Sequence, residues 1–124
     1  MDKLKVLVAD DEASVRLTVS KLLGEEYTVL QARDGKEAIA MTLVEKPDII
    51  LLDVMMPNVD GYTACSTIKQ EKSTKTIPVV MLTALDFDLN RELAIQIGAN
   101  AYITKPFLPE DLRSTIRLLT KPTS

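Results

Sequence analysis

The chain of 124 residues lacks histidine and tryptophan and contains a single cysteine, Cys65. The absence of histidine excludes histidine-based acid–base catalysis, a histidine nucleophile and a metal site built from imidazole ligands. One cysteine excludes an internal disulfide framework and a thiolate metal cluster. The apolar run in the basic start MDKLKVLV ends at Asp10, so it is too short for a signal-peptide core or a membrane span.

The chain also has no excess of positive charge. Its formal net charge is −3, and residues of both signs are mixed along the sequence. A surface that binds nucleic acid would show a basic patch or stripe. We therefore expect a cytoplasmic domain that contacts neither nucleic acid nor a membrane directly.

Short apolar segments alternate with segments whose apolar residues recur at helical spacing. This order predicts a parallel sheet with helices on both faces, in one domain at residues 1–120 followed by a tail or the start of a linker at 121–124. The expected strands are residues 4–9, 27–32, 48–53, 78–83 and 101–104. The expected helices are residues 13–24, 35–45, 61–71, 87–97 and 109–119.

The helix expected at 35–45 has recognisable signals at both ends. Asp34 is placed to cap its first turn, and Pro47 ends it. Its apolar residues at helical spacing are expected to face the core, namely Ala38, Ile39, Leu43 and Val44.

The segment PDIILLDVMMPNVDG, residues 47–61, organises the rest of the chain. Its consecutive apolar residues at 49–52 are typical of a strand covered on both sides, as in a parallel sheet. Asp53 ends this strand, and Asp60-Gly61 supplies turn chemistry before the next helix. Ligands bind at the carboxyl ends of the strands in an open parallel sheet, so Asp53 is a candidate site residue.

Other polar residues end the neighbouring strands, namely Asp10 and Asp11 after the first, Thr83 at the fourth and Lys105 after the fifth. Parallel strands bring these ends to one edge. Neighbouring carboxylates suit Mg²⁺, which favours a few carboxylates together with water and phosphate oxygens. A lysine and a hydroxyl suit an anionic phosphoryl group, and an aspartate can become an acyl phosphate. The set indicates Mg²⁺-assisted phosphoryl transfer to Asp53.

Each of these residues also has an ordinary structural explanation. Asp10 or Asp11 alone is most simply the N-cap of a helix, and Asp53 alone could start a turn. Thr83 is an ordinary strand end, and Lys105 a solvated loop charge. Their joint placement at four strand ends is what favours a site.

Together these motifs closely resemble the receiver domain of two-component response regulators. The matching segments are Asp10-Asp11, LLDVMMPNVDG around Asp53, Thr83-Ala84 and YITKPF at 102–107. The resemblance covers about residues 5–119. It implies a doubly wound, flavodoxin-like α/β fold with five parallel strands in the order 2-1-3-4-5 and five helices. It also implies a cis peptide between Lys105 and Pro106.

The resemblance further implies a role for each site residue. Asp53 accepts a phosphoryl group from a phosphohistidine, which another protein must supply because this chain has no histidine. Lys105 pairs with the phosphoryl oxygens, while Thr83 moves to bond the new phosphate and Tyr102 turns inward. Without the family, Tyr102 is simply a core aromatic with its hydroxyl at the surface. The implied Mg²⁺ ligands are Asp10, Asp11, Asp53 and the backbone carbonyl of Met55.

The implied partner is a sensor histidine kinase or a phosphotransfer protein. The implied output is a switch of the surface formed by the fourth helix, fifth strand and fifth helix, with a phosphorylation-dependent homodimer as a family expectation. Positions two past the acceptor and two past the switch threonine are Met55 and Leu85, both apolar, so we expect slow loss of the phosphoryl group.

Three alternatives belong to other functional classes. A degenerate receiver would bind partners without being phosphorylated, although the intact acidic set argues against it. A haloacid-dehalogenase-like phosphatase needs a second carboxylate two residues after the nucleophile, where Met55 stands. A flavodoxin-type nucleotide module needs a Ser/Thr/Gly-rich loop after the first strand, which here is Asp10-Asp11-Glu12. We therefore expect a signalling domain and not an enzyme with a turnover substrate.

Overall fold

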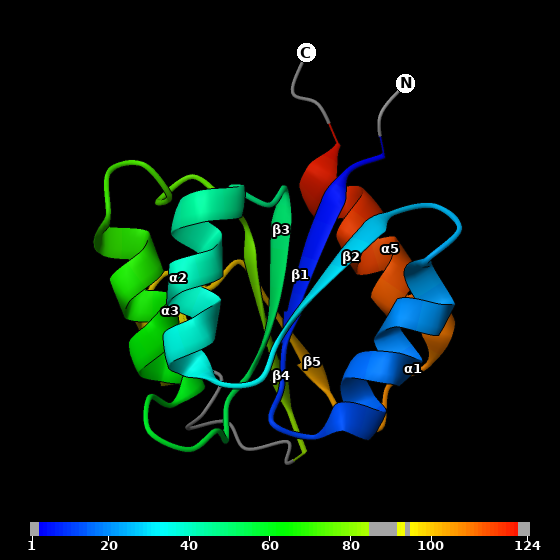
Figure 1. Cartoon of the computed structure of the whole chain (residues 1–124), viewed down its shortest axis with the longest axis horizontal. Coiled ribbons are helices and arrows are strands. Elements are labelled where there is room, and N and C mark those ends of the chain that lie inside the picture. Colours follow the sequence, from blue (N-terminus) through cyan, green and yellow to red (C-terminus); the bar gives the residue numbers. More distant parts are fainter. Residues whose placement is uncertain (1–2, 85–91, 94, 122–124) are drawn as a thin grey trace.

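The computed structural model describes residues 3–84, 92–93 and 95–121. A five-stranded parallel sheet crosses the molecule, with its strands in the order β2-β1-β3-β4-β5 (Figure 1). The strands are β1 Lys5–Ala9, β2 Thr28–Ala32, β3 Ile49–Asp53, β4 Val79–Thr83 and β5 Ala101–Thr104. The helices with defined bounds are α1 Ala13–Leu23, α2 Gly35–Glu45, α3 Gly61–Gln70 and α5 Pro109–Thr120.

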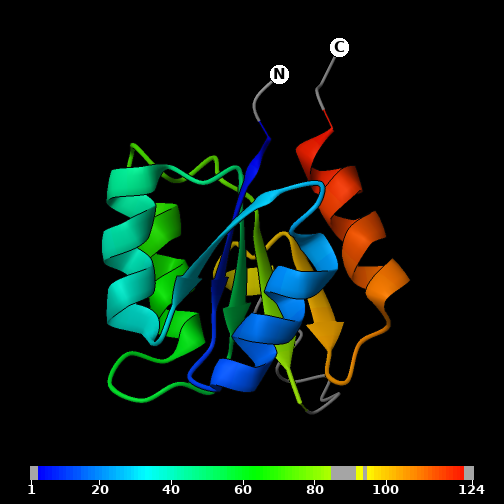
Figure 2. The same ribbon diagram turned by 45° about the vertical axis from the view of Figure 1, so that its right-hand side comes forward.

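The helices form two layers, with α1 and α5 on one side of the sheet and α2 and α3 on the other, as Figures 1 and 2 both show. Alternation along each strand gives each layer its own core. Val6 and Val8 of β1 pack with buried residues of α1 and α5, whereas Leu7 and Ala9 pack with buried residues of α2 and α3. β3 is buried along its whole length because it is central and covered on both faces.

The strand register aligns the strand ends that matter for function. Ala9 lies opposite Leu52, so Asp10 and Asp53 leave neighbouring strands in step. Thr83 lies opposite Thr104, which places Lys105 one residue beyond. The sequence therefore correctly predicted the sheet, its order and the common edge.

The face that α2 presents to the core agrees with the expected one only in part: Ala38 is buried and Ile39 is partly buried against the core, as predicted. Asp34 does cap the helix, because its Oδ1 accepts a hydrogen bond from the Glu37 N–H at 2.8 Å. Leu43 and Val44, however, are 43% and 78% exposed, so the prediction that they face the core was wrong. The buried positions of this helix are Gly35, Ala38 and Thr42.

The reason is close packing at the first turn of α2. A Cβ built on Gly35 would lie 2.2 Å from the carbonyl oxygen of Val59, so only glycine fits there. The helix therefore turns Gly35, Ala38 and Thr42 fully inward and leaves Leu43 and Val44 exposed.

The helix expected at 87–97 falls largely outside the described residues. Within that range, the described residues 92, 93, 95 and 96 are helical. No helix in the described part of the chain is long and apolar enough to cross a membrane.

Candidate functional site

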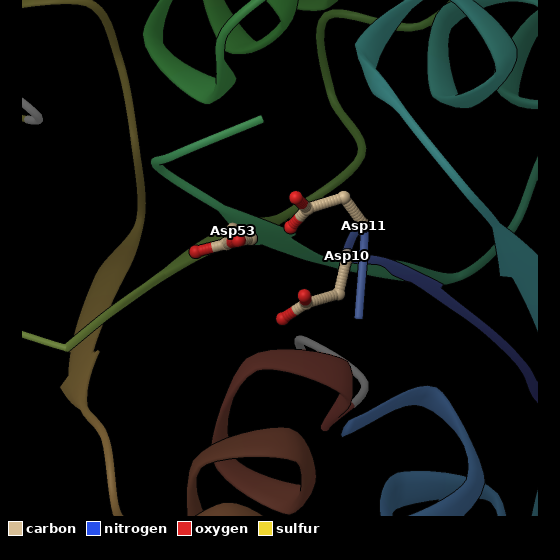
Figure 3. A group of neighbouring side chains, drawn as sticks. All are labelled: Asp10, Asp11 and Asp53. Atoms are coloured by element: carbon tan, nitrogen blue, oxygen red, sulfur yellow. The ribbon is translucent and has the colours of Figure 1, made fainter. Parts of the chain in front are cut away.

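Three carboxylates meet at the carboxyl ends of β1 and β3. Asp10 and Asp11 follow β1, Asp53 ends β3, and their side chains reach toward the same region beside the two strand ends (Figure 3). One oxygen of each carboxylate lies within 4.8 Å of the others. Asp10 and Asp53 are buried whereas Asp11 is exposed, so the cluster opens to solvent on the side of Asp11.

Lys105 connects the two buried carboxylates. Its Nζ lies 3.0 Å from Asp10 Oδ2 and 3.3 Å from Asp53 Oδ1, and its side chain is only 14% exposed. It is therefore not a solvated loop charge. The peptide between Lys105 and Pro106 is cis, as the resemblance implied.

Asp10 is used within the site and does not cap α1. Its Oδ1 accepts a hydrogen bond from the Glu12 N–H at 2.9 Å, and its own N–H donates to the Ala32 carbonyl of β2 at 3.1 Å. The N-cap residue of α1 is Glu12, whose side chain makes no capping bond. The simpler explanation for Asp10, a helix cap, therefore does not apply.

Burial and charge shift the pKa values of both central groups. Burial, and then the Asp10 carboxylate, raise the pKa of Asp53 from 3.8 to about 6, although Lys105 opposes the shift. Burial alone would lower the pKa of Lys105, but its hydrogen bond to Asp10 and the charge of Asp53 raise it. Lys105 thus remains protonated at neutral pH, and Asp53 is held in an environment that does not fully compensate its charge.

Gly61 allows the helix after the site to pack against the end of β3. A Cβ built there would lie 2.1 Å from the carbonyl oxygen of Asp53. Asp60 is the N-cap of α3, and its Oδ1 accepts a hydrogen bond from the Thr63 N–H at 2.8 Å. The sequence had indicated turn chemistry at Asp60-Gly61, but the role of Gly61 is close approach to Asp53, which the sequence does not reveal.

The remaining predicted residues lie around this centre. Thr83 is the last residue of β4 and is 3% exposed. Side chains two residues apart in a strand point to the same face of the sheet, so Thr83 shares a face with Val79 and Met81. Tyr102 of β5 packs against the core cluster on that face. Met55 is 74% exposed, and its N–H donates to Asp53 Oδ1 at 3.4 Å. Leu85 lies outside the described residues.

The donor set suits Mg²⁺. All three side chains offer carboxylate oxygens, which are the hard ligands that this ion prefers, and one exposed ligand leaves room for water. Two of the three carboxylates contact the ammonium group of Lys105, which is the one cation that contacts the cluster within the described residues, so the cluster carries more negative charge than this cation neutralises. A divalent cation would compensate this excess.

Comparison with known proteins agrees with the fold and the acidic cluster. The sequence model of the response regulator receiver domain matches residues 6–117. The chain belongs to this family. It is 47% identical to the response regulator PleD of Caulobacter vibrioides over 118 residues, which cover 94% of this chain and 26% of PleD. The chain thus spans about a quarter of that relative's length.

Solved receiver structures have the same fold. The chemotaxis protein CheY4 of Vibrio cholerae superposes with a TM-score of 0.90 and 33% identity, covering 94% of this chain and 98% of CheY4. The receiver domain of the sensor histidine kinase PA1611 from Pseudomonas aeruginosa gives a TM-score of 0.89 and 26% identity, covering 97% of this chain and 99% of that one. In that structure a magnesium ion is coordinated in the active-site cleft.

Proposed function

We propose that this receiver domain accepts a phosphoryl group on Asp53 from a phosphohistidine of a sensor histidine kinase or phosphotransfer protein. The observation that carries the proposal is the placement of Asp53, buried, 3.3 Å from the ammonium group of Lys105 and clustered with two further carboxylates. This arrangement combines a nucleophile, a partner for phosphoryl oxygens and metal ligands in one place.

The transfer exchanges one bond to phosphorus for another. An oxygen of the ionised Asp53 carboxylate attacks the phosphorus atom, and the P–N bond to the donor histidine breaks as its electron pair returns to the imidazole ring. With a pKa of about 6, Asp53 is mainly ionised at neutral pH and available for this attack. Lys105 binds the phosphoryl oxygens and opposes their negative charge.

The Mg²⁺ ligands in this proposal are Asp10, Asp11, Asp53 and the backbone carbonyl of Met55. When bound, Mg²⁺ neutralises part of the charge that the phosphoryl oxygens bring to the site. A groove of about 590 Å³ opens beside Lys105 between α1 and the start of α5, and Val15, Leu22 and Phe107 contribute apolar surface to it. It offers a donor protein a contact surface beside Lys105, whose ammonium group lies 3.3 Å from Asp53.

Phosphorylation then acts as a local change of charge. It adds about −1.5 to −2 charges and three strong acceptor oxygens at the end of β3. Thr83 bonds the new phosphate and Tyr102 turns inward. The surface formed by the fourth helix, which lies largely outside the described residues, together with β5 and α5 then changes to control an output, which includes a phosphorylation-dependent homodimer. The size of the shift is limited by the difference in affinity of the two states for the phosphate.

The domain has no turnover substrate in this proposal and is not an enzyme. The competing function is a degenerate receiver that binds partners without phosphorylation, and it would not need Lys105 held between two buried carboxylates. Intact mass after incubation with acetyl phosphate separates the two functions. We expect one phosphoryl adduct that requires Mg²⁺ and is absent in Asp53→Asn. If no adduct forms under any condition, the degenerate receiver is the better description.

A further inference from the structure

Arg16 of α1 contacts the backbone that carries two of the three acidic residues. Its Nη1 donates a hydrogen bond to the Asp10 carbonyl oxygen at 2.7 Å, and its Nε donates to Gln31 Oε1 at 3.3 Å. We infer that Arg16 is a positioning residue, which holds the Asp10–Asp11 peptide so that both carboxylates reach the metal site. This inference rests on the proposed function, because it assumes that these carboxylates bind Mg²⁺.

Other hydrogen bonds at the start of the loop between β1 and α1 hold the N–H and the side chain of Asp10, and the Asp10 N–H donates to the Ala32 carbonyl of β2 at 3.1 Å. The side chain of Asp10 is already bonded to the Glu12 N–H and to Lys105. Glu12, the N-cap residue, makes no capping bond with its side chain, and Asp11 is exposed. The bond from Arg16 acts on a different group, the carbonyl of the peptide that joins Asp10 to Asp11, and so bears directly on the orientation of that peptide. A short bond from a charged donor is among the stronger hydrogen bonds in proteins.

The guanidinium group is itself fixed by β2. Gln31 accepts from Arg16 Nε, and its own Nε2 donates to Ser20 Oγ at 3.1 Å. Ser20 Oγ in turn donates to the Arg16 carbonyl oxygen at 2.8 Å, which closes a ring of contacts between α1 and β2. Arg16 belongs to α1, and its guanidinium group is bonded to Gln31 of β2. Its bond to the Asp10 carbonyl therefore fixes the Asp10–Asp11 peptide relative to both elements.

A positioning role and a simple charge effect predict opposite results. A cation near a metal site repels the metal, so removal of the Arg16 charge alone would strengthen Mg²⁺ binding. If Arg16 positions the loop, its removal weakens Mg²⁺ binding despite the lost repulsion. Groups that orient metal ligands from outside the ligand shell typically contribute about 10- to 100-fold to metal affinity.

The test is a calorimetric Mg²⁺ titration of the unphosphorylated protein. We expect Arg16→Gln to weaken Mg²⁺ binding about tenfold, measured as a rise in the dissociation constant. Arg16→Lys, which keeps the charge but has no planar pair of donors, should fall between Arg16→Gln and the wild type. Arg113→Gln is the matched control, because Arg113 Nη2 donates to the Leu22 carbonyl at 3.2 Å at the far end of α1. It removes the same charge and the same kind of contact, and should leave Mg²⁺ affinity unchanged.

Unchanged or tighter Mg²⁺ binding by Arg16→Gln would overturn the inference. Titrations are run below the unfolding temperature of each variant. If Arg16→Gln does not fold, Arg16→Lys and Gln31→Ala are used for the same test, with smaller expected losses of Mg²⁺ affinity. If the wild type binds no Mg²⁺, the proposed function fails and the inference fails with it. If the wild type binds Mg²⁺ and is phosphorylated while the variants match it, only the inference about Arg16 fails.

Discussion

Replacement of Asp53 by asparagine is expected to stabilise the metal-free protein at neutral pH. The substitution keeps the size of the side chain and removes a buried charge beside Asp10. The rise in the Asp53 pKa from 3.8 to about 6 corresponds to about 3 kcal/mol at 1.36 kcal/mol per pKa unit. Solvent enters the site beside the exposed Asp11 and screens these charges, so we expect a gain of about 1.5 kcal/mol in the free energy of unfolding.

The pH dependence of this gain follows from proton binding. Because the pKa of Asp53 is raised in the folded protein, the folded side chain holds its proton at pH values where the unfolded chain has lost it. This difference in bound protons lies between the two pKa values, 3.8 and about 6. The free energy of unfolding of the wild type therefore decreases as the pH rises through this range. The asparagine side chain of the variant has no such proton to lose. The difference between the variant and the wild type therefore grows from near zero at about pH 3.5 to its full value above about pH 7.

The assay is urea denaturation followed by far-UV circular dichroism, at several pH values in the presence of a chelator. Asp111→Asn, an exposed change of the same type at the start of α5, is the control and should show no such gain. Adding Mg²⁺ should reverse the order, because a ligand at about 100 times its dissociation constant stabilises the wild type by about 2.7 kcal/mol. An Asp53→Asn protein that is no more stable than the wild type at about pH 8 without Mg²⁺ would refute this reasoning.

Three further substitutions test other parts of the structure. Gly61→Ala should destabilise the fold by about 3 kcal/mol in urea denaturation, because the new Cβ meets the Asp53 carbonyl; a loss below about 1 kcal/mol would contradict the packing. Thr42→Val should stabilise it by about 1 kcal/mol, since Thr42 Oγ1 is buried with no hydrogen-bond partner among the described residues. A loss of stability would instead indicate a water bound to that hydroxyl in the adjoining cavity of about 30 Å³. Met55→Asn should shorten the lifetime of the phosphorylated protein about 2- to 10-fold, which is the effect of one hydrogen bond that orients the attacking water. The decay of the adduct is followed in intact-mass spectra, and an unchanged decay would exclude a role of position 55 in the phosphoryl lifetime.

The sequence predicted the sheet and its functional edge because both depend on local patterns. The apolar segments alternate with helical ones, which permits few arrangements other than a parallel sheet. Once the strands are parallel, the residues that follow them must meet, so Asp10, Asp53 and Lys105 could be placed together by sequence pattern alone. The meeting of the acidic loop and the lysine was therefore predictable from the pattern, whereas the strand order followed from the resemblance to the receiver family.

The features that the sequence did not reveal depend on contacts between distant elements. The buried face of α2 follows from the close approach of Gly35 to Val59, so small residues face inward and Leu43 outward. Gly61 looks like a turn residue in the sequence, although it is needed for contact with Asp53. The contact of Arg16 with the Asp10 carbonyl has no local pattern that would predict it.

The central claim is that Asp53 itself carries the phosphoryl group, and chemical trapping tests this most directly. The protein is phosphorylated with acetyl phosphate and Mg²⁺ and then treated with borohydride, which reduces an aspartyl phosphate to homoserine. Peptide mass spectrometry locates the change. We predict homoserine at position 53 and at no other aspartate, with no conversion when Mg²⁺ is withheld. Conversion at Asp10 or Asp11, or a stable adduct on a hydroxyl residue with position 53 unmodified, would contradict the account.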